Sequence, residues 1–211
     1  MKNKIILTVL LCSLLVNLSY AGGAWTQKKG EGYFKVSQWW LTFDQHFTSS
    51  GQLDPNVTTG VYNTFLYTEY GITDRFTGLF NGALFSRNYS NNLVSNTTGR
   101  TIVAGDAVNS IGDIDVGIKY SFTKPGAKFP IAGSLILGIP TGTSVAGEQK
   151  NLQTGDGEFN QIIQIDGATG FKVTEKISGY VNLYTGFNNR TNNFSEEFRY
   201  GGELGFGFLK S

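Results

Sequence analysis

The chain has 211 residues, of which one is cysteine and 16% are charged, with 17 basic against 16 acidic side chains. So balanced a charge offers no basic surface to nucleic acid, which we therefore exclude as a partner. Beyond residue 21 no stretch approaches the ~18 consecutive apolar residues that a membrane-spanning helix needs, which excludes a helical membrane protein.

The first 21 residues predict a secretory signal peptide. Two lysines within the first four residues precede an uncharged stretch, residues 5–16. Ser19 and Ala21 then place small residues at the two positions that a signal peptidase reads. We expect cleavage after Ala21, which leaves residues 22–211 as the exported domain and removes Cys12.

The exported domain predicts an all-β protein. With 28 Gly, 10 Tyr and 16 Phe but only 4 Pro, the chain is rich in turn and strand formers. The length of each predicted strand is close to the ~9 to 11 residues that a tilted strand needs to cross a membrane. The eight predicted strands cover residues 33–43, 61–71, 76–87, 112–122, 130–140, 159–172, 177–187 and 198–208.

The clearest of these strands is 112–122, in which apolar and polar residues alternate without a miss. Successive side chains of a strand point to opposite faces, so the strand has one apolar and one polar surface. The apolar face carries Ile114, Val116, Ile118, Tyr120 and Phe122, and the polar face Asp113, Asp115, Gly117, Lys119 and Ser121. The strands at 177–187 and 198–208 repeat this period. In 33–43 large apolar residues compete for both faces, so its register is not assigned.

The connections between the predicted strands alternate in length. Residues 44–60, 88–111, 141–158 and 188–197 form long polar segments, and residues 72–75, 123–129 and 173–176 form short ones. Outer-membrane barrels show this alternation, with the short turns in the periplasm. A soluble β-sandwich also alternates apolar and polar residues. We favour the barrel because of strand length, loop alternation and the aromatic residues near strand ends.

The sequence therefore predicts an antiparallel up-and-down transmembrane β-barrel in the outer membrane of a Gram-negative bacterium. Its expected partners are outer-membrane lipid, the barrel-assembly machinery and a small hydrophobic solute.

Three segments carry a resemblance to a known family. Residues 111–120 (IGDIDVGIKY), 135–142 (LILGIPTG) and 155–159 (GDGEF) resemble the family named for the MetA pathway of phenol degradation, proposed outer-membrane transporters. The opening segments 23–27 (GAWTQ) and 30–34 (GEGYF) are similar to its XagA-like members.

The resemblance implies a barrel that passes small hydrophobic or aromatic compounds. Members of the family are usually longer than this chain, which ends on Ser211 rather than on an aromatic residue. We therefore expect the C-terminus to be incomplete and the eight strands to belong to a larger even-numbered barrel. Eight strands alone would leave an interior filled by side chains.

Charged residues on the predicted inner face are candidate pore-lining groups. Asp113 and Asp115 stand two residues apart, with Lys119 further along the same face, and Arg199 and Glu203 lie on the polar face of the last strand. They either sort solutes or bind a cation at the lumen wall, or they pair with one another to satisfy enclosed charges. We favour charge pairing.

An inward ladder of Tyr180, Asn182 and Tyr184 is a second candidate site. Its rings could stack an aromatic solute while the amide hydrogen-bonds that solute. The same residues would also serve as inert lumen filling, and the sequence leaves both interpretations open.

No residues predict catalysis, and we expect neither a cofactor nor a metal. His46 is the only histidine and lies beside Asp44 in a loop, where a solvated histidine is the simpler account. The leading hypothesis is a passive channel for small hydrophobic or aromatic molecules. The alternatives are a non-transporting surface barrel that presents its long loops for adhesion or polymer assembly, and a lipid-modifying enzyme built around His46.

Overall fold

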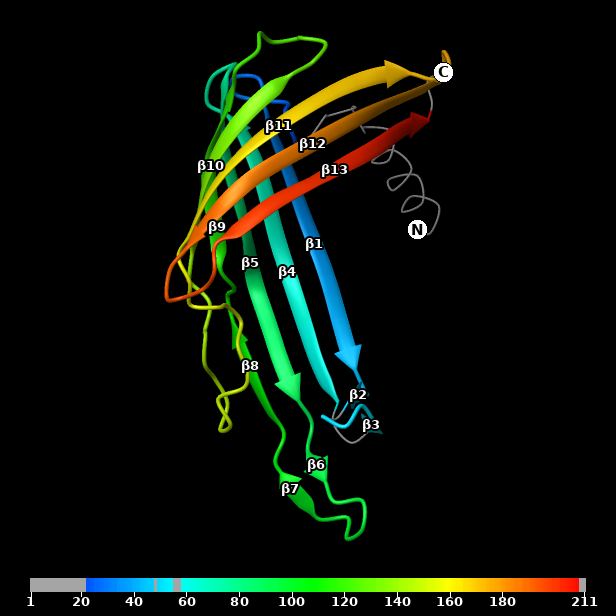
Figure 1. Ribbon diagram of the computed structural model, residues 1–211, viewed down its shortest axis with the longest axis vertical. Helices are drawn as coiled ribbons and strands as arrows, with labels where there is room; N and C mark the ends of the chain where they lie inside the picture. Colours follow the sequence, from blue (N-terminus) through cyan, green and yellow to red (C-terminus); the bar gives the residue numbers. More distant parts are fainter. Residues whose placement is uncertain (1–21, 48, 55–57, 209–211) are drawn as a thin grey trace, which may run out of the picture.

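The computed structural model describes residues 22–47, 49–54 and 58–208. The predicted signal peptide with Cys12, and the end of the chain at 209–211, lie outside the described residues. One antiparallel sheet dominates, and it curls into a half-barrel (Figure 1). Each long strand pairs with the next along the chain, as an up-and-down topology requires. The long strands are β1 (Gly32–Phe43), β4 (Thr59–Gly71), β5 (Phe76–Ser90), β9 (Ile114–Ser121), β10 (Ile131–Ile139), β11 (Asn160–Lys172), β12 (Ile177–Arg190) and β13 (Glu197–Phe208).

The eight predicted strands are confirmed, and the sandwich alternative is wrong because the long strands share one continuous sheet. Two details of the prediction are also wrong. The fourth strand begins at Ile114 instead of at residue 112, so Asp113 belongs to the preceding loop.

The predicted long segment 88–111 is not a plain loop either. It contains the last residues of β5, the hairpin of β6 (Leu93–Val94) and β7 (Thr101–Val103), and β8 (Asp106–Ser110), which pairs with β5. A second small hairpin, β2 (His46–Phe47) and β3 (Leu53–Asp54), follows β1.

The long and short connections lie at opposite ends of the sheet, as predicted (Figure 1). The turn end carries the short connections 72–75, 122–130 and 173–176. The loop end carries the connections that follow β1, β5, β10 and β12. Among the described residues no helix is long and apolar enough to cross a membrane.

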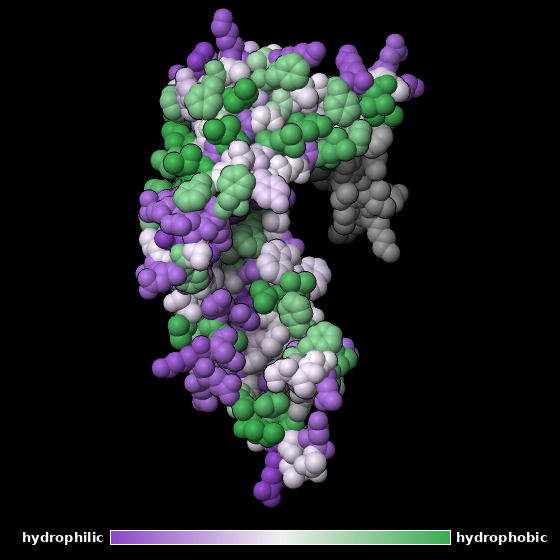
Figure 2. All heavy atoms as spheres, viewed as in Figure 1, coloured by the Kyte–Doolittle hydropathy of each residue, from purple (hydrophilic) through white to green (hydrophobic). Residues whose placement is uncertain are grey.

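The two faces of the sheet are inverted relative to a water-soluble protein. Among the described residues, the largest fully buried side chains are Glu69, Thr77, Glu158 and Asp166, none of them apolar. Large apolar side chains are instead exposed on the convex face, and Figure 2 shows them spread over the surface around β10 to β12. They include Phe34, Val36, Trp40, Ile118, Leu135, Ile163, Ile165, Leu183, Phe198 and Leu204.

The register of β1, which the sequence left open, follows from its pairing with β4. Tyr33, Lys35, Ser37 and Trp39 line the concave face, while the alternate residues of the strand are exposed on the convex face. In the strand order β1 and β13 are the two ends, and each pairs along one side within the described residues.

Candidate functional site on the concave face

A buried ion pair lies on the concave face near the turn end. Lys119 Nζ of β9 lies 3.0 Å from Glu69 Oε1 of β4, with side chains 4% and 0% exposed. Tyr67 donates its hydroxyl proton to Glu69 Oε1 at 2.5 Å, and Gln27 Nε2 donates to Glu69 Oε2 at 2.9 Å. Because the carboxylate accepts from three donors, these interactions offset the cost of removing it from water.

A segment outside the sheet, residues 22–30, crosses the concave face; we call it the strap. At one end Ala24 N donates to Asn182 Oδ1 of β12 at 3.0 Å, and at the other Gly30 N donates to the carbonyl of Gly71 in β4 at 2.8 Å. Between them Gln27 N donates to Thr77 Oγ1 at 2.9 Å. Since β5, β9, β10 and β11 separate β4 from β12, the strap spans the half-barrel like a chord.

The strap fits closely against both of its anchors. A Cβ atom on Gly23 would lie 2.2 Å from Asn182 Oδ1, and one on Gly71 would lie 1.9 Å from the carbonyl oxygen of Lys28. At Gly71 the close atoms are backbone, so only glycine fits there, whereas at Gly23 they belong to the Asn182 side chain. Ala24 is fully buried, and Lys119 Nζ donates to the carbonyl of Trp25 at 3.4 Å. The buried ion pair therefore supports the strap as well as the sheet.

An aromatic cleft of about 660 Å³ opens on the concave face beside the strap. Trp39 and Phe65 stack with ring centroids 6.3 Å apart, and Trp25 of the strap meets Tyr180 edge-on at 5.6 Å. Its lining mixes rings with polar groups: Trp25, Tyr33, Lys35, Ser37, Trp39, Phe65, Tyr67, Asn81, Tyr180 and Glu203. Apolar walls with few polar groups are typical of small-molecule sites.

A smaller polar cavity of about 320 Å³ adjoins the cleft, and Tyr67 and Asn81 line both. Asp115, Lys119 and Arg199 all line this second cavity, so the structure brings three of the predicted lumen residues together. Asp115 accepts a hydrogen bond from Asn81 Nδ2 at 3.2 Å.

The other predicted site residues have separate places. Tyr180 donates to Glu203 at the aromatic cleft, whereas the amide oxygen of Asn182 is used by the strap. The ring of Tyr184 lies over Gly201 of β13, where a Cβ would come within 2.7 Å of the ring. The predicted ladder is thus divided among three roles.

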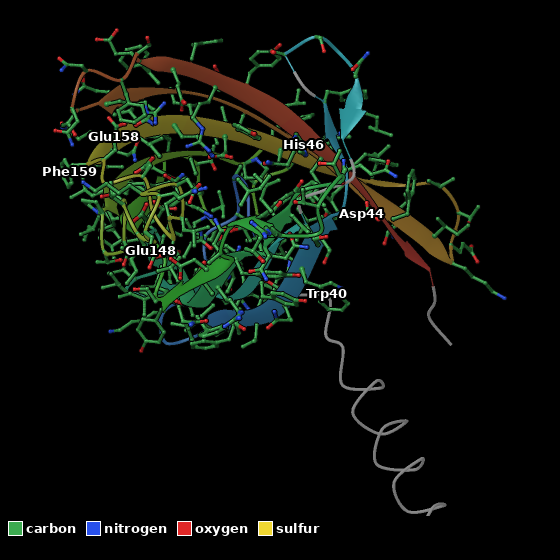
Figure 3. The ribbon with its side chains drawn as sticks, turned by 90° about the horizontal axis from the view of Figure 1, so that it is seen from below. Trp40, Asp44, His46, Glu148, Glu158 and Phe159 are labelled. Atoms are coloured by element: carbon green, nitrogen blue, oxygen red, sulfur yellow. The ribbon has the colours of Figure 1, made fainter. Side chains whose placement is uncertain are left out.

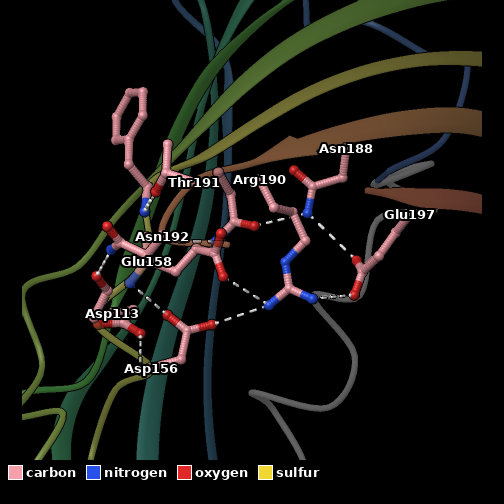
Figure 4. Close-up of polar contacts among 11 residues, drawn as sticks. Asp113, Asp156, Glu158, Asn188, Arg190, Thr191, Asn192 and Glu197 are labelled. Atoms are coloured by element: carbon pink, nitrogen blue, oxygen red, sulfur yellow. Dashed lines mark hydrogen bonds and ion pairs between the residues drawn. The ribbon is translucent and has the colours of Figure 1, made fainter. Parts of the chain in front are cut away.

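Asp113 belongs to a second network, at the loop end (Figure 4). Its Oδ1 accepts from Gly142 N and its Oδ2 from Asp156 N, both at 2.9 Å. Asp113 and Asp115, predicted to act together, therefore serve different structures, because the strand begins only after Asp113.

Arg190 is the centre of the loop-end network and lies near three carboxylates. Its Nη1 lies 2.7 Å from Glu197 Oε1, and its Nη2 lies 3.1 Å from Glu158 Oε2 and 3.6 Å from Asp156 Oδ2. Glu158 is 1% exposed, and its Oε1 atom has no hydrogen-bond partner in the described part of the chain. One base is therefore shared by more acids than it can neutralise.

Sequence reasoning missed the strap, Glu69 and Arg190. The signal for Glu69 was present, since it is the one charged residue within β4. His46 and Asp44 lie at the opposite side of the molecule from Glu158 in Figure 3. No group of three or more His, Cys, Asp or Glu side chains among the described residues is arranged to hold a metal ion.

Comparison with models of known protein families finds none that matches this chain, and comparison with curated proteins finds no match either.

Proposed function

We propose that this chain forms part of an outer-membrane β-barrel that passes small hydrophobic or aromatic molecules without an energy source. The observation that carries the proposal is the inversion of the two faces. Charged and polar side chains are buried on the concave face, while Phe34, Ile163 and Leu204 are exposed on the convex face. Such a surface is unfavourable in water and favourable against lipid tails.

The aromatic cleft supports the kind of solute proposed. A planar apolar molecule can lie against the rings of Trp39, Phe65 and Trp25 while Glu203 or Lys35 meets a polar substituent. The adjoining cavity around Asp115 and Arg199 continues the cleft along the concave face and adds polar groups to its lining.

A place in the membrane also sets a requirement on the two edge strands. Every backbone polar group within lipid needs a partner, because no water is available there. The outer edges of β1 and β13, which pair with no strand among the described residues, would therefore need partners, from each other, from another copy or from further strands. This fits the expectation of a larger even-numbered barrel.

Solute flux through proteoliposomes tests the proposal. We expect swelling in uncharged aromatic solutes, slowed several-fold by Trp39→Ala, which removes one wall of the cleft. Trp40→Ala is the matched control, because Trp40 is 63% exposed on the convex face and should leave the flux unchanged. A full-length barrel with no flux and no binding of aromatic solutes would overturn the proposal.

The projecting loop-end hairpins favour one alternative, a surface barrel that acts through its loops. The hairpin of β6 and β7 extends beyond the end of β5, beside which β8 lies (Figure 1). Asp106 of β8 accepts a hydrogen bond from Glu148 N at 2.9 Å, so two loops are held together. Replacing residues 93–103 with a short turn should abolish adhesion under this hypothesis and leave solute flux intact under the first.

A further inference from the structure

We propose that the strap, residues 22–30, is a built-in plug that closes the turn end of the passage and opens by leaving the concave face. The inference goes beyond the proposed solute pathway, because seating and release of the strap can be measured without any solute.

Strap residues line hollows on both sides of the segment. On one side it forms part of the wall of the aromatic cleft, through Trp25, and of the polar cavity, through Gly23. On the other side Ala24, Trp25 and Thr26 line a third hollow of about 330 Å³, together with residues of the turns near Asp74 and Pro125. Trp25 borders both sides, so the thickness of the barrier is that of the strap itself.

The strap is held by a few polar contacts instead of by strand pairing. Its attachments to the sheet include the bonds from Ala24 N to Asn182, Gln27 N to Thr77 and Gln27 Nε2 to Glu69. Water can replace the partner in each of these hydrogen bonds. Breaking one therefore costs far less free energy than the bond is worth in the absence of water. The long strands, by contrast, pair along many residues, 12 between β1 and β4 and 13 between β11 and β12.

The sheet keeps its own support when the strap leaves. Glu69 and Lys119 remain paired with each other, and Tyr67 still donates to Glu69. Release therefore exposes a satisfied ion pair to water and leaves no isolated charge behind. The exposed pair would then line the opened passage.

Cysteine labelling measures release of the strap directly. In a Cys12→Ser background, Ala24→Cys places a thiol at a fully buried position, and Lys28→Cys places one in the same segment where the lysine side chain is 79% exposed. A water-soluble maleimide should label the first on the order of a hundredfold more slowly than the second, which corresponds to a plug seated about 99% of the time. Equal rates would show that the strap is not seated. No labelling at position 24, under conditions that label the unfolded chain at once, would show that it never leaves. Either result overturns the plug.

A reversible lock provides a second measurement on one folded protein. A Cβ on Gly23 would lie 2.4 Å from Asn182 Cγ, so Gly23→Cys with Asn182→Cys is the pair to test for a disulfide that fixes the strap; both redox forms lack the Asn182 acceptor of Ala24 N. Gly23 has a φ of +64°, and the strain of a cysteine there is common to the oxidised and reduced forms. We expect oxidation to lower solute flux at least about tenfold and reduction to restore it.

The outcomes separate the plug from the proposed channel. Equal flux in the oxidised and reduced forms overturns the plug and leaves the channel standing. Absence of flux in both forms, with slow labelling at position 24, overturns the channel and supports a strap that opens.

Discussion

The two ends of the half-barrel each hold a charged network, and they differ in how well the charges are matched. At the turn end Lys119 forms an ion pair with Glu69, whose carboxylate is completed by neutral donors, and the buried Asp166 also interacts with Lys119. At the loop end Arg190 is shared by Asp156, Glu158 and Glu197. The first network joins strands to the strap, and the second joins the loop-end residues of β12 and β13 to the loop that carries Asp156 and Glu158.

This difference indicates two kinds of rigidity. A matched and fully buried pair has one good arrangement, so it fixes the positions of β4 and β9. A shared base has several arrangements of similar energy. One carboxylate oxygen of Glu158 has no hydrogen-bond partner among the described residues, and a rearranged loop could supply one. We expect the turn end to control global stability and the loop end to control local order.

Breaking the matched pair should give the largest effect. Lys119→Met leaves Glu69 buried without a countercharge, which we expect to lower the free energy of unfolding by about 3–5 kcal/mol. Urea unfolding in detergent micelles, followed by tryptophan fluorescence, measures it. The double variant Lys119→Met with Glu69→Gln should recover part of the loss, since Glu69 no longer carries a charge while the buried carboxyl of Asp166, which also interacts with Lys119, remains. If the double variant is no more stable than the single one, the loss comes from packing. The buried ion pair would then not be what stabilises the turn end.

Removing the shared base should cost less and act locally. Arg190→Gln leaves Glu158 without its cation, but Glu197 and Asp156 are partly exposed and can turn toward water. We expect the free energy of unfolding to fall by about 2 kcal/mol, less than for a fully buried pair, because two of the three acids are partly exposed. Hydrogen exchange should rise in residues 140–159 and 191–196 and stay unchanged around Glu69. Faster exchange in both places would show that the two ends unfold together.

A smaller change tests the loop end without altering its base. Asp113→Asn keeps one acceptor oxygen for Gly142 N or Asp156 N and turns an amide group toward the other donor. We expect a loss of about 1 kcal/mol, because one hydrogen bond to a charged group disappears. Limited proteolysis of the loop 140–159 should accelerate. Asp44→Asn, at the other side of the molecule, is the matched loop control and should change nothing.

The sequence predicted the sheet better than it predicted the site. Strand alternation over residues 112–122 reports which face is polar, because the period of two is a local property of the backbone. It could place Lys119 on the inner face, yet its partner Glu69 lies 50 residues away in the chain. No local pattern reports such a pairing. The start of β9 at Ile114 depends on the loop that Asp113 organises, so the two aspartates looked equivalent and are not.

The strap is the feature that the sequence predicted least. Residues 22–30 have no period, and their hydrogen bonds to the sheet reach 41 to 158 positions along the chain, to Gly71 and Asn182. A segment that is placed by single polar contacts has no signature of its own, because any polar stretch with glycines could be a free loop.

The smallest expected effect concerns an exposed ion pair between the strap and the residue that follows it. Lys28 Nζ lies 3.8 Å from Glu31 Oε1, with side chains 79% and 61% exposed. Glu31→Gln should change stability by less than about 0.5 kcal/mol, because water and salt screen such a pair. The labelling rate at position 24 should also stay the same, whereas Gln27→Ala, which removes a donor to Glu69, should raise that rate several-fold. A faster rate in Glu31→Gln would mean that exposed charges hold the strap, and the buried contacts at the turn end would lose the role assigned to them.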